Sequence, residues 1–348
     1  MQRFWCQSTV KLPLQQYMDR AVREPEWPHL DADRASALME AVLDQLTQSW
    51  EEGPLRESAL GRWQGEEYLR RVRHAASVLT RFASNADFQP LGTEMEFGVP
   101  GGLPPLILNL EDGHQIALQG TIDRLDVYHG PDADYLRVLD LKSSEKALDP
   151  ARMDSGEQLQ LMIYLQAALR GRPGALPAGA LYFPVQDRDV DAPSPEAAEE
   201  KRLKEVQLKG VVLAEENVLR AMDRDISPFS LPKAFNQDGS ISKSASWALP
   251  PETLRGLMDA AVKKAEEICG GIRSGAISAS PSVSEQRSPC SYCEYASVCP
   301  KRREDERPLP KGLSFQDVGK SLLQQNRCAK EENPAFNTWR IVKRLEPI

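Results

Sequence analysis

Two extended segments joined by a turn constrain the fold of this chain most strongly. Residues 115–128 alternate loosely between apolar and polar side chains, with Gly120 among them, and predict one strand. The sequence HGPDAD at residues 129–134 is rich in turn-forming residues. Residues 135–142 predict a second strand. Together these segments predict a β-hairpin.

Two carboxylates and a lysine lie on this hairpin. Asp140 and Lys142 are two residues apart on a strand, so they share a face, and Leu141 points to the other face. Asp123, on the first strand, can reach the same place across the hairpin. Two carboxylates suit a hard ion such as Mg²⁺, and the carbonyl of Leu141 would add a third oxygen. A lysine beside them can orient or deprotonate a metal-bound water, so the pattern predicts metal-assisted phosphodiester hydrolysis. For a lone Asp-x-Lys, an ordinary surface ion pair is the alternative.

Helical periodicity predicts the surroundings of the hairpin. Residues 31–85 are predicted to be largely helical, with further helices at 156–170 and 251–269 and short strands at 94–98, 105–110, 180–184 and 209–213. The charged, Pro- and Ala-rich residues 185–204 predict an exposed loop. Gly270-Gly271 predicts the end of the last helix. Gln160 and Tyr164 are four apart, so they share one helix face soon after the hairpin.

Three segments of the chain resemble the active-site motifs of one nuclease family. They are GTIDRLD at residues 120–126, VLDLKSS at 138–144 and LQLMIYL at 159–165. They resemble the RecB-type branch of the PD-(D/E)XK nuclease superfamily, and within it the AddB-type nuclease domains of AddAB helicase–nucleases. The resemblance implies two metal ligands, a catalytic lysine and two accessory residues. These positions are Asp123, Asp140, Lys142, Gln160 and Tyr164. It also implies an α/β fold, a mixed sheet flanked by helices.

The chain departs from this family in two respects. The family carries a metal-binding histidine on an early helix in a G-x-x-x-H context, and in the similar segment here Glu40 takes the histidine position. A carboxylate can also bind a hard ion, so Glu40 is predicted as a substitute ligand, with a solvated helix glutamate as the alternative. The resemblance covers about residues 4 to 305, without the helicase-like region that precedes this domain in the family.

Three cysteines fall within ten residues near the C-terminal end. Cys290, Cys293 and Cys299 have the spacing C-x2-C-x5-C, and thiolates clustered in this way usually hold a metal. On spacing alone, structural zinc and buried thiols remain alternatives. The resemblance implies a 4Fe-4S cluster whose fourth cysteine is remote, at the start of the domain. Cys6 is the candidate for that position, so the cluster would tie the two ends of the domain together.

Composition limits the remaining possibilities. The 348 residues are 41% hydrophobic with no apolar run of bilayer length, which predicts a folded cytoplasmic protein with no membrane segment. A net charge of −8 is not typical of a free-standing non-specific nucleic-acid binder. We expect a helical region at residues 1–90, a nuclease domain at 91–305 and a tail at 306–348.

The resemblance implies a Mg²⁺-dependent DNA exonuclease module in recombinational break repair. Its substrate would be single-stranded DNA delivered by a helicase, such as an AddA-type helicase/nuclease subunit. One alternative is a catalytically silent DNA-binding or structural module that folds around the cluster. Another is a nuclease that acts alone, similar to the CRISPR-associated exonucleases.

Overall fold

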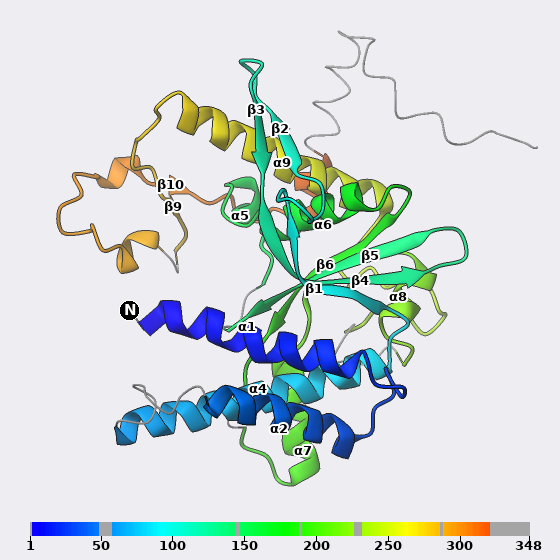
Figure 1. Ribbon diagram of the computed structural model, residues 1–348. Helices are drawn as coiled ribbons and strands as arrows, with labels where there is room; N and C mark the ends of the chain where they lie inside the picture. The colour runs from blue at the N-terminus through cyan, green and yellow to red at the C-terminus, as the bar shows by residue number, and fades with distance from the viewer. Residues whose placement is uncertain are drawn as a thin grey trace, which may run out of the picture.

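A six-stranded mixed sheet with helices on both sides forms the centre of the protein (Figure 1). The computed structural model describes residues 2–48, 58–143, 147–187, 190–225, 232–285 and 288–320, with backbone only for residues 2–10, 199 and 205. In spatial order the strands are β1 (Gln89–Phe97), β4 (Gly120–His129), β5 (Asp134–Lys142), β6 (Leu176–Pro184), β7 (Lys209–Leu213) and β8 (Ala248–Leu249). The β5–β6 and β7–β8 pairs are parallel and the others antiparallel, which confirms the predicted mixed α/β architecture.

Two small ribbons lie outside the central sheet. They are the hairpin of β2 (Leu106–Asn109) with β3 (Gln115–Leu118), and the parallel pair of β9 (Ser282–Val283) with β10 (Arg307–Pro308). The prediction of one strand over residues 115–128 was therefore wrong, because the chain leaves β3 at Gln119 and enters the central sheet as β4. The backbone is crowded at this exchange: a Cβ on Gly98, whose φ is 77°, would lie 2.6 Å from the carbonyl oxygen of Leu118.

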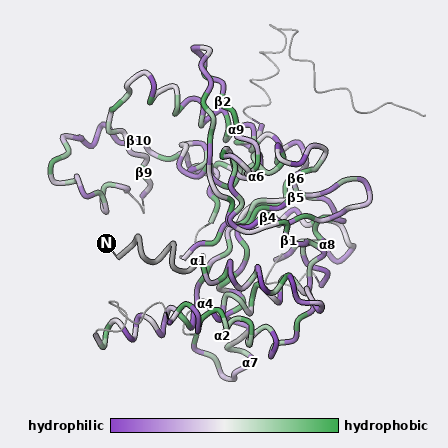
Figure 2. The backbone as a smooth tube through the Cα atoms, in the orientation of Figure 1, coloured by the Kyte–Doolittle hydropathy of each residue, from purple (hydrophilic) through white to green (hydrophobic). Residues whose placement is uncertain are grey.

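Eight described α-helices surround the strands. They are α1 (Gln2–Ala21), α2 (Ala32–Gln48), α4 (Ala59–Ser84), α5 (Pro150–Asp154), α6 (Gln160–Gly171), α7 (Pro195–Glu205), α8 (Glu216–Met222) and α9 (Pro251–Arg273), with 3₁₀ turns η1 (Pro289–Tyr292) and η2 (Arg303–Asp305). The predicted helices over residues 31–85 and from residue 251 are confirmed. Figure 2 shows hydrophobic and hydrophilic residues alternating along α2 and α4, as amphipathic helices require. None of the described helices is both long and apolar enough to cross a bilayer.

Three helix predictions need correction. The predicted loop 185–204 contains α7, because the Ser194 side chain caps the amide of Ala197 and Pro195 suits the first helical turn. Helix α6 begins at residue 160 rather than 156, since α5 and a turn precede it. Helix α9 continues through Gly270-Gly271 to Arg273, so the paired glycines do not end it.

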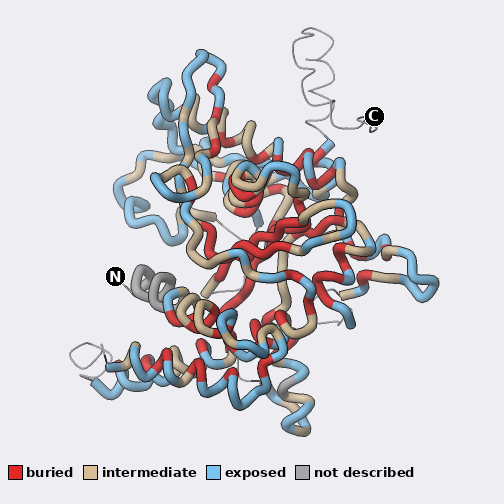
Figure 3. The backbone as a smooth tube through the Cα atoms, turned by 45° about the vertical axis from the view of Figure 1, so that its right-hand side comes forward, coloured by how far each residue is buried: buried red, intermediate tan, exposed pale blue. Residues whose placement is uncertain are grey.

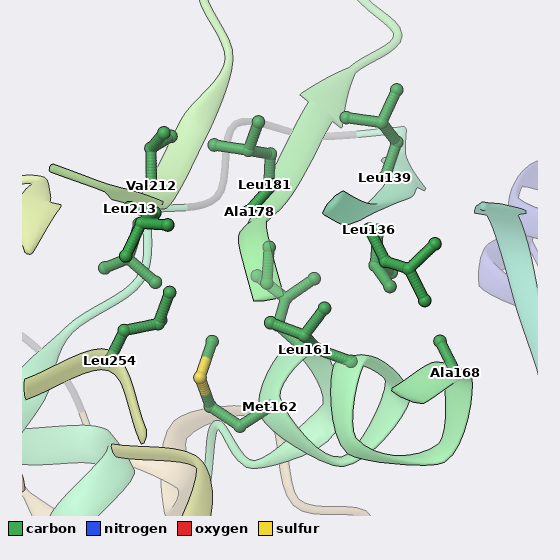
Figure 4. Close-up of a cluster of buried hydrophobic side chains, with 14 of the residues drawn as sticks. Leu136, Leu139, Leu161, Met162, Ala168, Ala178, Leu181, Val212, Leu213 and Leu254 are labelled. Atoms are coloured by element: carbon green, nitrogen blue, oxygen red, sulfur yellow. The ribbon is translucent and has the colours of Figure 1, made fainter. Parts of the chain in front are cut away.

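Each face of the sheet has its own hydrophobic core. Figure 4 shows Leu161 and Met162 of α6 packed beneath Leu181 of β6, and α9 adds Leu254 to this core. On the other face, α1, α2 and α4 pack their apolar side chains around Leu141 and two residues from the end of β6. The central strands are therefore buried on both faces (Figure 3), which explains their nearly continuous apolar sequences.

The predicted domain boundaries at residues 90 and 305 stay predictions. The helices before residue 90 share a core with the sheet. Residues beyond 305 also pack on the body, since Val318 is 4% exposed and Gly319 lies against Gly256 of α9. A Cβ on Gly256 would lie 2.5 Å from the Gly319 carbonyl oxygen, so glycine is needed for this close approach.

A fully buried ion triad lies between β4 and β5. The carboxylate of Asp126 accepts hydrogen bonds from Arg124 at 2.7 Å and from Arg137 at 2.8 Å. Burial raises the pKa of Asp126, but the two guanidinium groups outweigh it and hold the pKa below its usual value. The two arginines depend on this single carboxylate, since all three side chains are almost completely shielded from water.

We predict that Asp126→Asn lowers the free energy of unfolding by about 3–5 kcal/mol, because it leaves two buried guanidinium groups without a counter-charge. Chemical denaturation monitored by circular dichroism measures this change. Asp112→Asn is the matched control, since it breaks an exposed ion pair with Arg273 and should change stability little. Equal effects of the two substitutions would contradict the prediction.

Candidate active site

The site lies where β4 and β5 separate. Backbone pairing between these strands runs from His129–Asp134 to Arg124–Leu139. Beyond that point β4 continues against β1, whereas β5 continues against β6. The amide of Leu141 donates instead to Oδ2 of Asp123, at 2.8 Å. A carboxylate thus replaces the backbone partner at the opening of the fork, and it lies one strand away from Asp140.

A continuous chain of polar contacts runs from the fork into α6. Nζ of Lys142 lies 2.5 Å from Oδ2 of Asp140 and donates to Oε1 of Gln160 at 3.2 Å. The Gln160 amide then donates to the Tyr164 hydroxyl at 2.9 Å. Gln160 is the first residue of α6, the helix that connects β5 to β6. The structure therefore brings together the hairpin residues and the helix pair that the sequence indicated.

The tyrosine at the end of this chain of contacts is packed as well as hydrogen-bonded. The ring of Tyr164 meets that of Phe97 edge-on, with centroids 5.9 Å apart. A Cβ on Gly120 would lie 2.8 Å from the Phe97 ring, so a glycine at the start of β4 leaves room for this pair.

Crowding of negative charge characterises the fork. Asp140 is completely buried, and Oδ1 accepts no hydrogen bond from the residues that the structure describes. Burial, and then repulsion from Asp123, raise the pKa of Asp140 above its usual value, although Lys142 partly counteracts them. Such a carboxylate gains little from the folded protein alone and is well placed to bind a cation.

Glu94 of β1 is a third carboxylate at the fork, and sequence reasoning did not identify it as a site residue. Its neighbours Thr93 and Met95 pair with Arg124 and Ile122, so it lies level with Asp123. Its φ of 45° is left-handed, which is rare for a non-glycine residue and common at functional sites. Burial and repulsion from Asp123 raise its pKa, and its buried Oε1 has no hydrogen-bond partner within the described ranges.

Lys11 of α1 is the second residue that sequence reasoning missed. Its ammonium group donates to Oδ1 of Asp123 at 2.7 Å. Burial acts to lower the pKa of Lys11, but the carboxylates Asp123, Asp140 and Glu94 outweigh it and raise the pKa. No local pattern signals this contact, since 112 residues separate the partners.

Glu40, the predicted substitute ligand, has a different partner. Both of its carboxylate oxygens accept hydrogen bonds from Arg73 of α4, at 2.6 and 2.8 Å. It lines a pocket between the N-terminal helices whose lining includes neither Asp123 nor Asp140. Helix α1, rather than α2, supplies the helical side chain that contacts Asp123.

Comparison with known proteins identifies the family. The model of the PD-(D/E)XK nuclease superfamily matches residues 14–300. The chain belongs to the PD-(D/E)XK nuclease superfamily. The forked hairpin with Asp123, Asp140 and Lys142 is thus where this superfamily's motif falls in the fold.

Curated relatives of this PD-(D/E)XK chain are all named as the same AddB-type component of an ATP-dependent helicase/deoxyribonuclease. The protein of Moorella thermoacetica is 36% identical over 284 residues, which are 79% of this chain and 25% of that protein. Those of Alkaliphilus oremlandii and Alkaliphilus metalliredigens are 29% and 30% identical, over 86% and 82% of this chain and 27% and 26% of theirs. The predicted similarity to AddB-type proteins is confirmed, and the chain spans about a quarter of their length.

The donor chemistry of the PD-(D/E)XK fork fits a hard divalent ion. Asp123, Asp140 and Glu94 offer carboxylate oxygens, and two of these oxygens are buried without hydrogen bonds from described residues. The side chains are not gathered around one point, because no group of three or more His, Cys, Asp and Glu within the described ranges is arranged to hold a metal. In this arrangement an ammonium group contacts Asp123.

The three clustered cysteines lie on a loop closed by β9 and β10. Figure 1 shows this loop (orange) extending from the body on the same side as the N-terminus. Cys290 lies in η1 and Cys293 directly follows it. The thiols of Cys290 and Cys299 both contribute to raising the pKa of Lys301, after its hydrogen bond to Glu306, so both lie near one ammonium group. The side chain of Cys6 is outside the described residues, and a cluster of the four cysteines stays a prediction.

We predict that Asp140→Asn raises the melting temperature of the metal-free protein at pH 7. The raised pKa means that folding disfavours the ionised form, so this carboxylate costs stability once the pH exceeds its folded pKa. A neutral isostere removes that cost, and the gap should narrow as the pH falls toward 3.8. Scanning calorimetry in chelator measures it.

Asp123→Asn is the matched comparison for this experiment. The Asp123 carboxylate accepts hydrogen bonds from Leu141 and Lys11, so its replacement should bring no gain. A lower melting temperature for Asp140→Asn than for the wild type would contradict the assignment of Asp140 as the strained carboxylate.

Proposed function

We propose that this chain is a metal-dependent deoxyribonuclease module that hydrolyses phosphodiester bonds. The observation that carries the proposal is the contact chain from Asp140 through Lys142 and Gln160 to Tyr164, next to buried carboxylate oxygens without partners. Asp123 and Asp140 would hold Mg²⁺, together with the carbonyl of Leu141. We leave Glu40 out of this ligand set because Arg73 binds its carboxylate.

The roles of the side chains follow from their contacts. The ion, when bound, offsets charge on the phosphate and activates water. Lys142 is held between Asp140 and Gln160, and the Tyr182 ring lies 5.7 Å from its ammonium group. An ammonium fixed in this way can orient the attacking water and stabilise developing negative charge. Gln160 and Tyr164 then act as positioning residues for Lys142.

The substrate and partner of the module are inferred from its relatives. Their shared name joins a helicase to a deoxyribonuclease, so we propose DNA as the substrate and a helicase-bearing protein as the partner, in double-strand break repair. Unwinding delivers single strands, which supports an exonuclease acting on single-stranded DNA. A net charge of −8 is compatible with a partner that supplies much of the DNA-binding surface.

We also propose that the cysteine loop carries a 4Fe-4S cluster. Cys290, Cys293 and Cys299 lie on a loop whose ends are held together by the β9–β10 pair. Three cysteines leave one coordination position, for which Cys6 at the other end of the domain is the candidate. The cluster would then connect α1 to the C-terminal loop and stabilise the relative position of the two.

We predict that Lys142→Ala lowers the rate of single-stranded DNA hydrolysis in Mg²⁺ by about 10²-fold or more, the usual contribution of a positioned proton-handling group. Degradation of end-labelled DNA, with and without chelator, measures the rate. The control is Lys204→Ala on α7, which removes an exposed lysine paired with Glu200 and should keep full activity. Equal rates for wild type and Lys142→Ala would refute the proposed mechanism.

We predict about four iron atoms and four acid-labile sulfides per chain after anaerobic purification. Cys293→Ser should lose most of this iron, whereas Cys269→Ser, which alters a cysteine of α9 outside the loop, should retain it. Metal analysis and the visible absorption of the cluster measure both. Stoichiometric zinc without iron would overturn the iron–sulfur proposal.

A catalytically silent DNA-binding module is the second candidate function. The contact of Lys11 with Asp123 favours it, because this ammonium group takes up a carboxylate oxygen that a metal would need. The nuclease assay separates the two candidates. DNA binding without hydrolysis by the wild type, at any Mg²⁺ concentration, would support the silent module.

A further inference from the structure

A lysine from the first helix reaches into the carboxylate cluster. Leu14, Tyr17 and Met18 are almost completely buried and fix α1 against the neighbouring helices and the sheet. One turn earlier, Lys11 extends its ammonium group to within 2.7 Å of Oδ1 of Asp123. The Asp123 side chain is 3% exposed and that of Lys11 is 28% exposed, so the lysine approaches from the open side of the fork.

The charges at the fork show what this lysine does. Asp123, Asp140 and Glu94 all act on the Lys11 ammonium. Lys142 already binds Asp140 and Gln160, so Lys11 is the described cation in contact with Asp123. A divalent ion bound by Asp123 would need the same carboxylate and would be repelled by an ammonium a few ångströms away.

We propose that Lys11 is an internal counter-ion that competes with the divalent ion for Asp123. In the metal-free protein it offsets the repulsion among the carboxylates. Metal binding requires its side chain to withdraw, and a partly exposed four-carbon side chain on a fixed helix can swing toward solvent without moving α1. Lys11 thereby sets the metal concentration at which the site fills. This inference rests on the proposed metal-dependent function.

The test is calorimetric titration of the full chain with Mn²⁺ and with Mg²⁺. Lys11→Met removes the charge but keeps the length and apolar character of the side chain, so it should bind the ion about tenfold or more tightly than the wild type. Lys11→Arg keeps the charge and should bind no better than the wild type. Lys264→Met, which removes an exposed lysine paired with Glu267 on α9, should leave the affinity unchanged.

Thermal denaturation gives a second readout that does not depend on activity. Without metal, Lys11→Met should melt below the wild type, because repulsion between Asp123 and its neighbours is no longer offset. With excess Mn²⁺ the deficit should shrink or reverse, since tighter binding stabilises the folded state more. Lys11→Gln serves as a second uncharged variant if Lys11→Met does not fold.

Each outcome separates the two proposals. Equal or weaker affinity in Lys11→Met, with measurable binding by the wild type, overturns the role of Lys11 and leaves the metal-dependent nuclease standing. Absence of binding by the wild type and by both uncharged variants overturns both. Tighter binding by Lys11→Met and Lys11→Gln, with no gain for Lys11→Arg, supports the internal counter-ion.

Discussion

The hydrogen bond from the Leu141 amide to the Asp123 carboxylate is the contact on which the site depends. It occurs just past the last backbone pair between β4 and β5, where each strand continues against a different neighbour. A side chain thus satisfies an amide that the fork would otherwise leave unpaired. The same bond fixes Asp123 beside Asp140, so the separation of the strands and the assembly of the site have one cause.

This arrangement places like charges together, and the fold tolerates them only with compensation. Asp140 and Glu94 have raised pKa values and buried oxygens without hydrogen bonds from described groups. Lys142 and Lys11 offset part of the repulsion from opposite ends of the chain. Charge crowding of this kind is costly in the folded state and useful for binding cations, which is a common relation between stability and function. The neighbouring Asp126 shows the contrast, since two arginines satisfy it completely.

Local patterns predicted much of the site because its main elements are local. The alternation of a strand places Asp140 and Lys142 together, and the period of a helix places Gln160 beside Tyr164. Predictions failed where local signals competed. The charged composition of residues 195–205 suggested a loop, but a capping serine and buried contacts by Leu203 and Val206 make it a helix. A similar ambiguity concealed the division of residues 115–128, since both halves are extended and only strand partners distinguish them.

The sequence by itself determined the mixed α/β class, the hairpin carrying the Asp-x-Lys pattern and the nuclease family, because each depends on periodicity or motif spacing within short segments. Only the tertiary structure decided which helix and which further carboxylate enter the site. Lys11 reaches Asp123 from 112 residues away, and Glu94 becomes level with Asp123 only through the register of β1 against β4. Glu40, chosen by analogy, pairs with Arg73 instead. The physical reason is that charges interact through space, and helix packing and strand pairing set these distances.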